Sequence, residues 1–153
     1  MLKSKWSTYL SILSGILLTL NIAACSVKDE SSSITTSSNK KASVTTLEIL
    51  YMNHGPVQPI LSDLELLLKP YKKDVLIGMY DYEKDLDFKN KKGINSHVPI
   101  VIWVNNQNII NINGKEVKFI GFPKDKGPGF AQGKWTYDEL RFALDKAIEE
   151  SKK

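Results

Sequence analysis

Cysteine and arginine are almost missing from this chain of 153 residues, which contains one of each, Cys25 and Arg141. A single cysteine excludes an internal disulfide and a metal site built from several cysteines. Cys25 also lies near the N-terminus, well before the part of the chain that has globular patterning. Because a disulfide oxidoreductase needs an attacking thiolate and a resolving thiol, that chemistry is excluded for the globular part.

Long apolar runs are missing too, since none reaches the roughly 20 residues that cross a bilayer. The segment that comes nearest, residues 9–20, is interrupted by serine and threonine. It follows Lys3 and Lys5 and precedes small residues at 23 and 24, an order typical of a signal peptide. An uncleaved membrane anchor is the alternative, for which the run is short.

The four residues Ile22-Ala23-Ala24-Cys25 resemble the lipobox of bacterial lipoproteins. The resemblance implies that Cys25 receives a diacylglyceryl group and becomes the first residue of the mature chain. We therefore expect residues 1–24 to be a lipoprotein signal peptide. The mature protein is expected at the cell membrane, lipid-anchored on its extracytoplasmic face.

Residues 25–46 are rich in serine, threonine and lysine and poor in residues that could form a core. Such a composition cannot bury enough apolar surface to fold, so we expect a disordered tether between the anchor and a single domain at residues 47–153. The formal charge of the chain is +4, and removal of Lys3 and Lys5 leaves 19 basic against 17 acidic residues. Because the lysines are dispersed among acids, no nucleic-acid partner is expected.

The domain begins with a pattern typical of a strand, a helix and a second strand. Residues 47–52 predict the first strand, Pro59 and Pro70 bound the helix, and residues 74–80 predict the second strand. This order favours a parallel pair of strands joined by the helix. The charged residues 81–95 predict a short helix followed by a loop.

The second half of the domain predicts a central strand, a hairpin and a terminal helix. Residues 98–104 form the most hydrophobic strand, and Asn113-Gly114 is a strong hairpin signal. The asparagine-rich residues 105–108 are an alternative turn. Residues 121–135 form a long irregular connection, and a capping box at residues 136–139 opens the last helix.

His54-Gly55-Pro56-Val57 stands between the first strand and the helix, where thioredoxins carry Cys-Gly-Pro-Cys, and Pro99 follows His54 by 45 residues. With the order of elements, these motifs make residues 47–153 resemble the thioredoxin family. The resemblance implies a thioredoxin-like α/β fold in three layers, with a central mixed sheet flanked by helices. Both cysteine positions are filled by other residues, so it also implies a redox-inactive member that is no thiol-disulfide enzyme.

In that family an extended peptide binds beside the active-site turn, a cis-proline and the loop after the hairpin. The resemblance therefore implies a cis bond between Val98 and Pro99. The loop at residues 121–135 is enlarged relative to that family, and one hypothesis is that it lies over the groove as a lid. The implied groove residues are His54, Gly55, Pro56, Val57, Val98, Pro99, Gly121 and Phe122.

The two histidines, His54 and His97, are expected near the same end of the domain. A neutral imidazole at a helix N-terminus could ligate a metal or act as a base, and Met52 and Met79 could add thioether donors for copper. The simpler interpretation is an exposed histidine in place of a cysteine. Two histidines fall short of the ligand sets of zinc sites, so no metal or other cofactor is expected.

These observations together predict a lipoprotein whose domain binds a protein or peptide of the cell envelope, or a secreted one. The first alternative is a metal carrier or an enzyme that uses His54 and His97. The second is a structural or accessory role in the envelope or in secretion, with no ligand in the groove.

Overall fold

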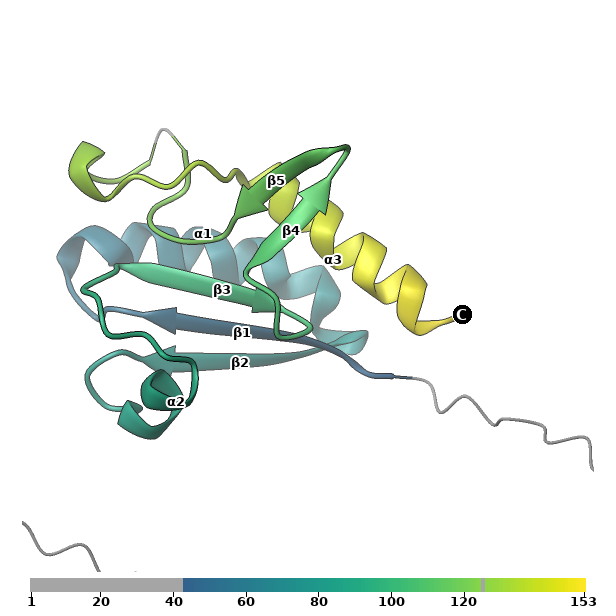
Figure 1. Cartoon of the computed structure of the whole chain (residues 1–153), viewed down its shortest axis with the longest axis horizontal. Helices are drawn as coiled ribbons and strands as arrows, with labels where there is room; N and C mark the ends of the chain where they lie inside the picture. Colours follow the sequence, from purple (N-terminus) through teal and green to yellow (C-terminus); the bar gives the residue numbers. More distant parts are fainter. Residues whose placement is uncertain (1–42, 125) are drawn as a thin grey trace, which may run out of the picture. The chain divides into compact units, whose positions relative to one another are not determined.

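The computed structural model of the chain describes residues 43–124 and 126–153. Strands and helices alternate in a mixed arrangement, which confirms the α/β class (Figure 1). The strands are β1 (Thr45–Tyr51), β2 (Val75–Asp81), β3 (Ile100–Val104), β4 (Ile109–Ile112) and β5 (Lys115–Lys118). The α-helices are α1 (Gln58–Leu68), α2 (Leu86–Lys91) and α3 (Tyr137–Ser151), and the short 3-10 helices are η1 (Gly55–Val57), η2 (Lys69–Lys73) and η3 (Gly129–Ala131).

The main sheet has the strand order β2-β1-β3, with β1 parallel to β2 and antiparallel to β3. The predicted parallel pair with a crossover helix is therefore confirmed. The central strand is β1, so the prediction that β3 would be central is wrong. The outer edge of β3 is nevertheless partly satisfied, because the Ile102 amide donates to the Phe119 carbonyl at 2.9 Å and the Gly121 amide donates to the Ile100 carbonyl at 2.8 Å.

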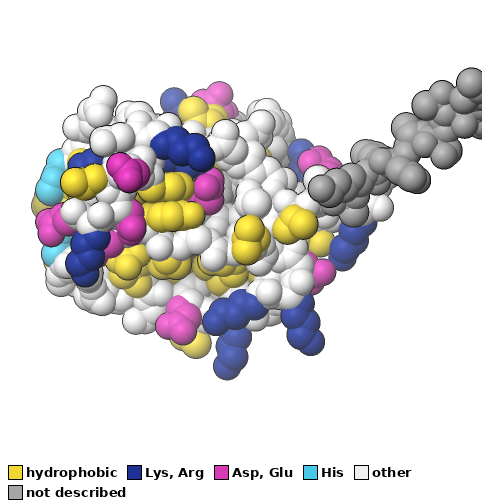
Figure 2. Space-filling view, turned by 90° about the horizontal axis from the view of Figure 1, so that it is seen from below, with side chains coloured by type: hydrophobic (Ala, Val, Ile, Leu, Met, Phe, Trp, Pro, Cys, Tyr) yellow, Lys and Arg dark blue, Asp and Glu magenta, His cyan; other side chains and the backbone are white. Residues whose placement is uncertain are grey.

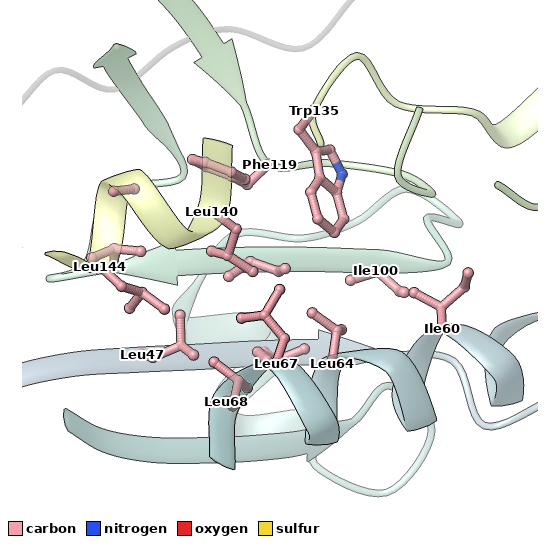
Figure 3. Packing of buried hydrophobic residues seen from close by; sticks show 14 of the residues in the cluster. Leu47, Ile60, Leu64, Leu67, Leu68, Ile100, Phe119, Trp135, Leu140 and Leu144 are labelled. Atoms are coloured by element: carbon pink, nitrogen blue, oxygen red, sulfur yellow. The ribbon is translucent and has the colours of Figure 1, made fainter. Parts of the chain in front are cut away.

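Helices α1 and α3 bury one face of this sheet. In Figure 3 the leucines of α1 meet those of α3 and the inward side chains of β1 and β3 around Phe119 and Trp135. Leu64, Leu140 and Leu144 are fully buried there. A capping box starts α3 as predicted: Thr136 Oγ1 accepts from the Glu139 amide and the Glu139 carboxylate accepts from the Thr136 amide. The sequence therefore fixes both where α3 begins and which side it buries.

The opposite face is covered by α2, which gives the domain three layers. Tyr80 stacks on Phe88 with ring centroids 3.6 Å apart, and Phe88 meets the edge of Trp103 at 5.8 Å. Lys92 closes this aromatic cluster: its ammonium is ion-paired with Glu48 and lies 5.0 Å from the centre of the Trp103 ring. A cation over an indole face is favourable, and more so when water is excluded.

Both asparagine-rich turns form. Asn113 and Gly114 have φ of 51° and 82° in the β4–β5 hairpin, and Asn105 and Asn106 have φ of 48° and 66° between β3 and β4. Asparagine and glycine adopt positive φ more readily than other residues, and this pair of values suits two-residue hairpins. The two turns that seemed alternatives in the sequence are therefore consecutive.

The peptide bond between Val98 and Pro99 is trans, so the expected cis bond is wrong. Trans is the intrinsically preferred isomer, by about 0.5 to 1 kcal/mol for a bond before proline. The trans chain still brings the Pro99 carbonyl to the Met52 amide at 2.9 Å. The end of β1 is thus tied to the start of β3 without a cis turn.

The expected signal peptide, the expected lipidation site Cys25 and the expected tether up to residue 42 lie outside the described residues. Strand β1 begins at Thr45, two residues before the expected start of the domain. Thr45 is buried and its hydroxyl donates to the Ala147 carbonyl of α3 at 3.2 Å. Within residues 43–124 and 126–153, no helix is long and apolar enough to span a membrane.

Two leucines of α1 provide a matched test of this core. Leu64 is fully buried, whereas Leu66 is 70% exposed. We expect Leu64→Ala to lower the free energy of unfolding by about 2 to 5 kcal/mol, because it opens a cavity, and Leu66→Ala to change it by less than about 0.5 kcal/mol. Urea denaturation measures both, and equal losses in the two variants would contradict the packing of α1.

Candidate functional site

A cavity of about 400 Å³ lies at the end of the sheet where β1 stops and β3 starts. Four segments converge on it: the turn after β1, the residues before β3, the residues after β5 and the region of η3. A larger hollow of about 710 Å³ lies elsewhere, beside β2 and α1. The residues lining the smaller cavity are Met52, His54, Pro56, His97, Val98, Pro99, Ile120, Gly121, Phe122, Pro128, Phe130, Ala131 and Gln132.

Main-chain hydrogen bonds hold the first two walls in place. Besides the bond from Met52 to Pro99, the His54 amide donates to the Met52 carbonyl at 3.0 Å, and the Val57 amide donates to the His54 carbonyl at 3.0 Å. The turn therefore winds directly into η1 and α1, with Pro56 in the first turn, where a missing N–H costs nothing. Hydrogen bonds within the protein therefore define this wall.

The wall formed by the long loop is closed at its neck by further main-chain bonds. The Phe122 amide donates to the Ala131 carbonyl at 2.9 Å, and the Gly133 amide donates back to the Phe122 carbonyl at 2.7 Å. One step further out, the Lys124 amide donates to the Trp135 carbonyl at 2.7 Å. Pro128 and Phe130 are thereby held against the cavity, so the loop forms one of its walls.

Two glycines allow the strands of the loop to lie close to each other and to the Phe122 ring. Gly121 has φ of 81°, and a Cβ added there would lie 2.8 Å from the Ala131 carbonyl oxygen. Gly127 has φ of 71°, and a Cβ there would lie 2.5 Å from the Phe122 ring. Both positions combine a left-handed backbone with a crowded site, and glycine alone meets both conditions without strain.

Most of the cavity lining is apolar, and its polar side chains, those of His54, His97 and Gln132, are exposed at the rim. None of the described residues that line the cavity is a lysine, arginine, aspartate or glutamate. Phe122 is 1% exposed and forms part of the floor, while Phe130 is 94% exposed at the edge. An exposed phenylalanine beside an apolar cavity is unfavourably hydrated and can contact an apolar ligand.

A network of side-chain hydrogen bonds holds the turn that precedes His54. Gln58 Nε2 donates to Asn53 Oδ1 at 2.7 Å, and Asn53 Nδ2 donates to Asp81 Oδ2 at 3.3 Å. The hydrogen bond from the Glu83 amide holds the pKa of Asp81 below its ordinary value, and Asn53 and Lys84 act in the same direction against the effect of burial. The ionised carboxylate at the end of β2 is therefore part of the support of the turn.

Both histidines line the cavity, as expected from the sequence, and Figure 2 shows histidine side chains gathered at one end of the molecule. His97 stands edge-on to Tyr82, with ring centroids 6.1 Å apart, and the Tyr82 hydroxyl donates to the Ser96 carbonyl at 3.1 Å. Both imidazoles are exposed. Among the described residues, no three histidine, cysteine or carboxylate side chains are grouped so that they could hold a metal ion.

The structure brings six of the eight expected groove residues to this cavity: His54, Pro56, Val98, Pro99, Gly121 and Phe122. Gly55 is exposed but lies outside the lining. Val57 is fully buried and belongs to the core. The groove residues expected from the sequence did not include Phe130 and Pro128. The sequence shows there only an aromatic residue within a stretch rich in glycine and proline.

No protein-family model matches this chain, and the comparison with curated proteins gives no match.

The Asp81 carboxylate provides a test that depends on pH. The pKa of Asp81 is lower in the folded state than its ordinary value of 3.8, so the ionised carboxylate stabilises the folded state above pH 3.8. This contribution is lost as the pH falls through the lower pKa of the folded state. We expect Asp81→Asn to be less stable than the wild type at pH 6, with the difference shrinking below about pH 4. Urea denaturation between pH 6 and 2.5 measures this.

The exposed Glu150 supplies the control, since Glu150→Gln should change the unfolding free energy by less than about 0.5 kcal/mol at pH 6. A stability difference between wild type and Asp81→Asn that stays constant over the whole pH range would show that Asp81 acts by its shape and not by its charge.

Proposed function

We propose that this protein is a membrane-anchored, extracytoplasmic lipoprotein whose domain binds a protein or peptide segment in the cavity beside His54. The observation that carries the proposal is the exposed Phe130 at the edge of an apolar cavity whose described lining residues include no lysine, arginine, aspartate or glutamate. Such a site suits an extended segment that inserts one apolar side chain and lays its main chain across the polar rim. We further propose that the anchor is a lipid on Cys25.

The proposed fold family is a redox-inactive thioredoxin-like one. Supporting it are the order of elements from β1 to α3, the mixed sheet between α1 and α3 on one face and α2 on the other, and the turn at His54 beside Pro99. The trans bond before Pro99 departs from the pattern of that family. Without cysteine in the domain, the retained arrangement can offer binding but no disulfide exchange.

Metal transport is a second candidate, favoured by one specific observation. His54, His97 and the thioether of Met52 line the same cavity. Imidazole and thioether are ligands that suit copper, above all Cu(I). The proposed membrane location would suit a carrier as well as a binding module.

Phe130 is the residue to test for peptide binding. Peptides selected from a random library against the wild-type protein should lose about 10-fold to 100-fold in affinity for Phe130→Ala, because burial of a phenylalanine contributes about 1.5 to 3 kcal/mol. Phe142→Ala is the matched control: Phe142 is 41% exposed on α3, outside the cavity, and its loss should change affinity less than about 2-fold. Calorimetric titration supplies the dissociation constants. Equal affinity for wild type and Phe130→Ala would reject the site.

The metal candidate predicts one-site binding of Cu(I) that is lost in the double variant His54→Ala, His97→Ala. Met52→Leu should weaken binding, whereas Met79→Leu should leave it unchanged because Met79 lies outside this cavity. Competition with a chromophoric Cu(I) chelator measures the affinity. Binding that is absent, or that survives in the double variant, eliminates the carrier function and leaves the peptide site untouched.

A further inference from the structure

Two adjacent residues at the end of β2, Asp81 and Tyr82, contact both of the segments that carry a histidine to the cavity. Strands β1 and β2 end, and β3 begins, at the same end of the sheet (Figure 1). Residues 52–54 leave β1 at this end, and residues 96–98 lead into β3 there. The end of β2 therefore lies where it can hold two walls of the cavity at once.

The first of these walls is the turn that carries His54. The Tyr82 amide donates to the Tyr51 carbonyl at 2.8 Å, and the Asp81 carboxylate accepts from the Asn53 side chain at 3.3 Å. The first bond continues the pairing of β1 with β2 beyond the last residue of β2. Both bonds therefore fix the chain just before it reaches His54.

The side chain of Tyr82 contacts the second wall, which carries His97. Its hydroxyl donates to the Ser96 carbonyl at 3.1 Å, and its ring is inclined at 72° to the His97 ring, with centroids 6.1 Å apart. Lys89 of α2 places its ammonium 4.4 Å from the centre of the same tyrosine ring. A perpendicular ring pair and a cation near an aromatic face are both favourable geometries. The Tyr82 ring thus joins α2 to the segment before β3.

Packing holds Tyr82 in the orientation that these contacts need. The residue is half-buried, and it packs against both apolar clusters of the domain, the one under α1 and α3 and the one under α2. A side chain whose rotamer is locked by packing can hold a neighbouring segment in place more precisely than a freely rotating one. The Tyr82 hydroxyl is therefore a fixed point for residues 96–98.

We propose that Tyr82 is the positioning residue of the candidate site, because it joins the two walls and sets the position of the His97 segment relative to the His54 turn. Its amide holds one wall through Tyr51, and its hydroxyl holds the other through Ser96. Walls that are already in place raise the affinity for a ligand, because less freedom is lost on binding. The effect on ligand affinity rests on the proposed function, whereas the effect on the placement of His97 does not.

NMR of the full chain in detergent micelles, without ligand, tests the placement of His97. Tyr82→Phe removes only the hydroxyl, and Tyr82→Leu removes the aromatic ring as well. We expect the ring-proton signals of His97 to move in both variants, further in Tyr82→Leu, and to move more than those of His54. The matched control is Tyr80→Phe, at a ring that stacks on Phe88 of α2, and it should leave the His97 signals in place. Signals of His97 that stay in place in the Tyr82 variants, or move equally in the control, would overturn the proposal.

The same spectra separate a positioning role from a general contribution to the core. In Tyr82→Phe the ring and its packing are kept, so the amide signals of β1 and α3 should stay in place while those of residues 96–98 move. Changes spread over β1 and α3 would show that Tyr82 supports the core as a whole, which also overturns the positioning role.

Calorimetric titration tests the effect of Tyr82 on binding. Peptides selected from a random library against the wild type should bind Tyr82→Phe about 3-fold to 10-fold more weakly, which is the range expected for one net hydrogen bond. Tyr80→Phe should change the affinity less than about 2-fold. Equal affinity for wild type and Tyr82→Phe would overturn a role of this residue in binding. A wild type that selects no peptide rejects the proposed function, and the His97 signals then decide the role of Tyr82 alone.

Discussion

Strand β1 is hydrogen-bonded along both edges, buried on the face that holds Leu47 and Ile49 and partly buried on the other, and the layers of the domain are arranged around it. Its neighbours are fixed by register, Thr45 against Val75 on one side and Leu47 against Val104 on the other. Its alternate side chains then require two covers, α1 with α3 on one face and α2 with Lys92 on the other. The chain leaves β1 at the place where these layers end, and the candidate cavity lies there because three other segments end or begin at the same edge.

The support of the cavity comes mainly from the main chain, while its surface comes from side chains. The bonds from Met52 to Pro99, from Phe122 to Ala131 and from Gly133 to Phe122 join main-chain atoms only. The aromatic and proline side chains are placed on this frame with little freedom left to lose on binding. The described residues that line the cavity are mainly apolar side chains held on this main-chain frame.

Local patterns predicted the local structure well. The apolar spacing in α1, the capping box at Thr136 and the Asn113-Gly114 turn each involve residues a few positions apart, and all three form as expected. What the patterns missed depends on distant contacts. The burial of Val57 in the core and the approach of Phe130 to His54 are decided by segments tens of residues away, which a single sequence does not reveal.

The hydrogen-bonded neck of the long loop separates the tip of the loop, whose sequence can change, from the sheet. Main-chain bonds at Phe122 and Gly133 and at Lys124 and Trp135 close the loop before its tip begins, so changes of sequence at residues 128–132 need not disturb the sheet. Descendants of this protein, or engineered versions of it, can therefore exchange the tip that carries Phe130 and acquire a different specificity on an unchanged scaffold, much as antibodies vary their loops on a constant framework.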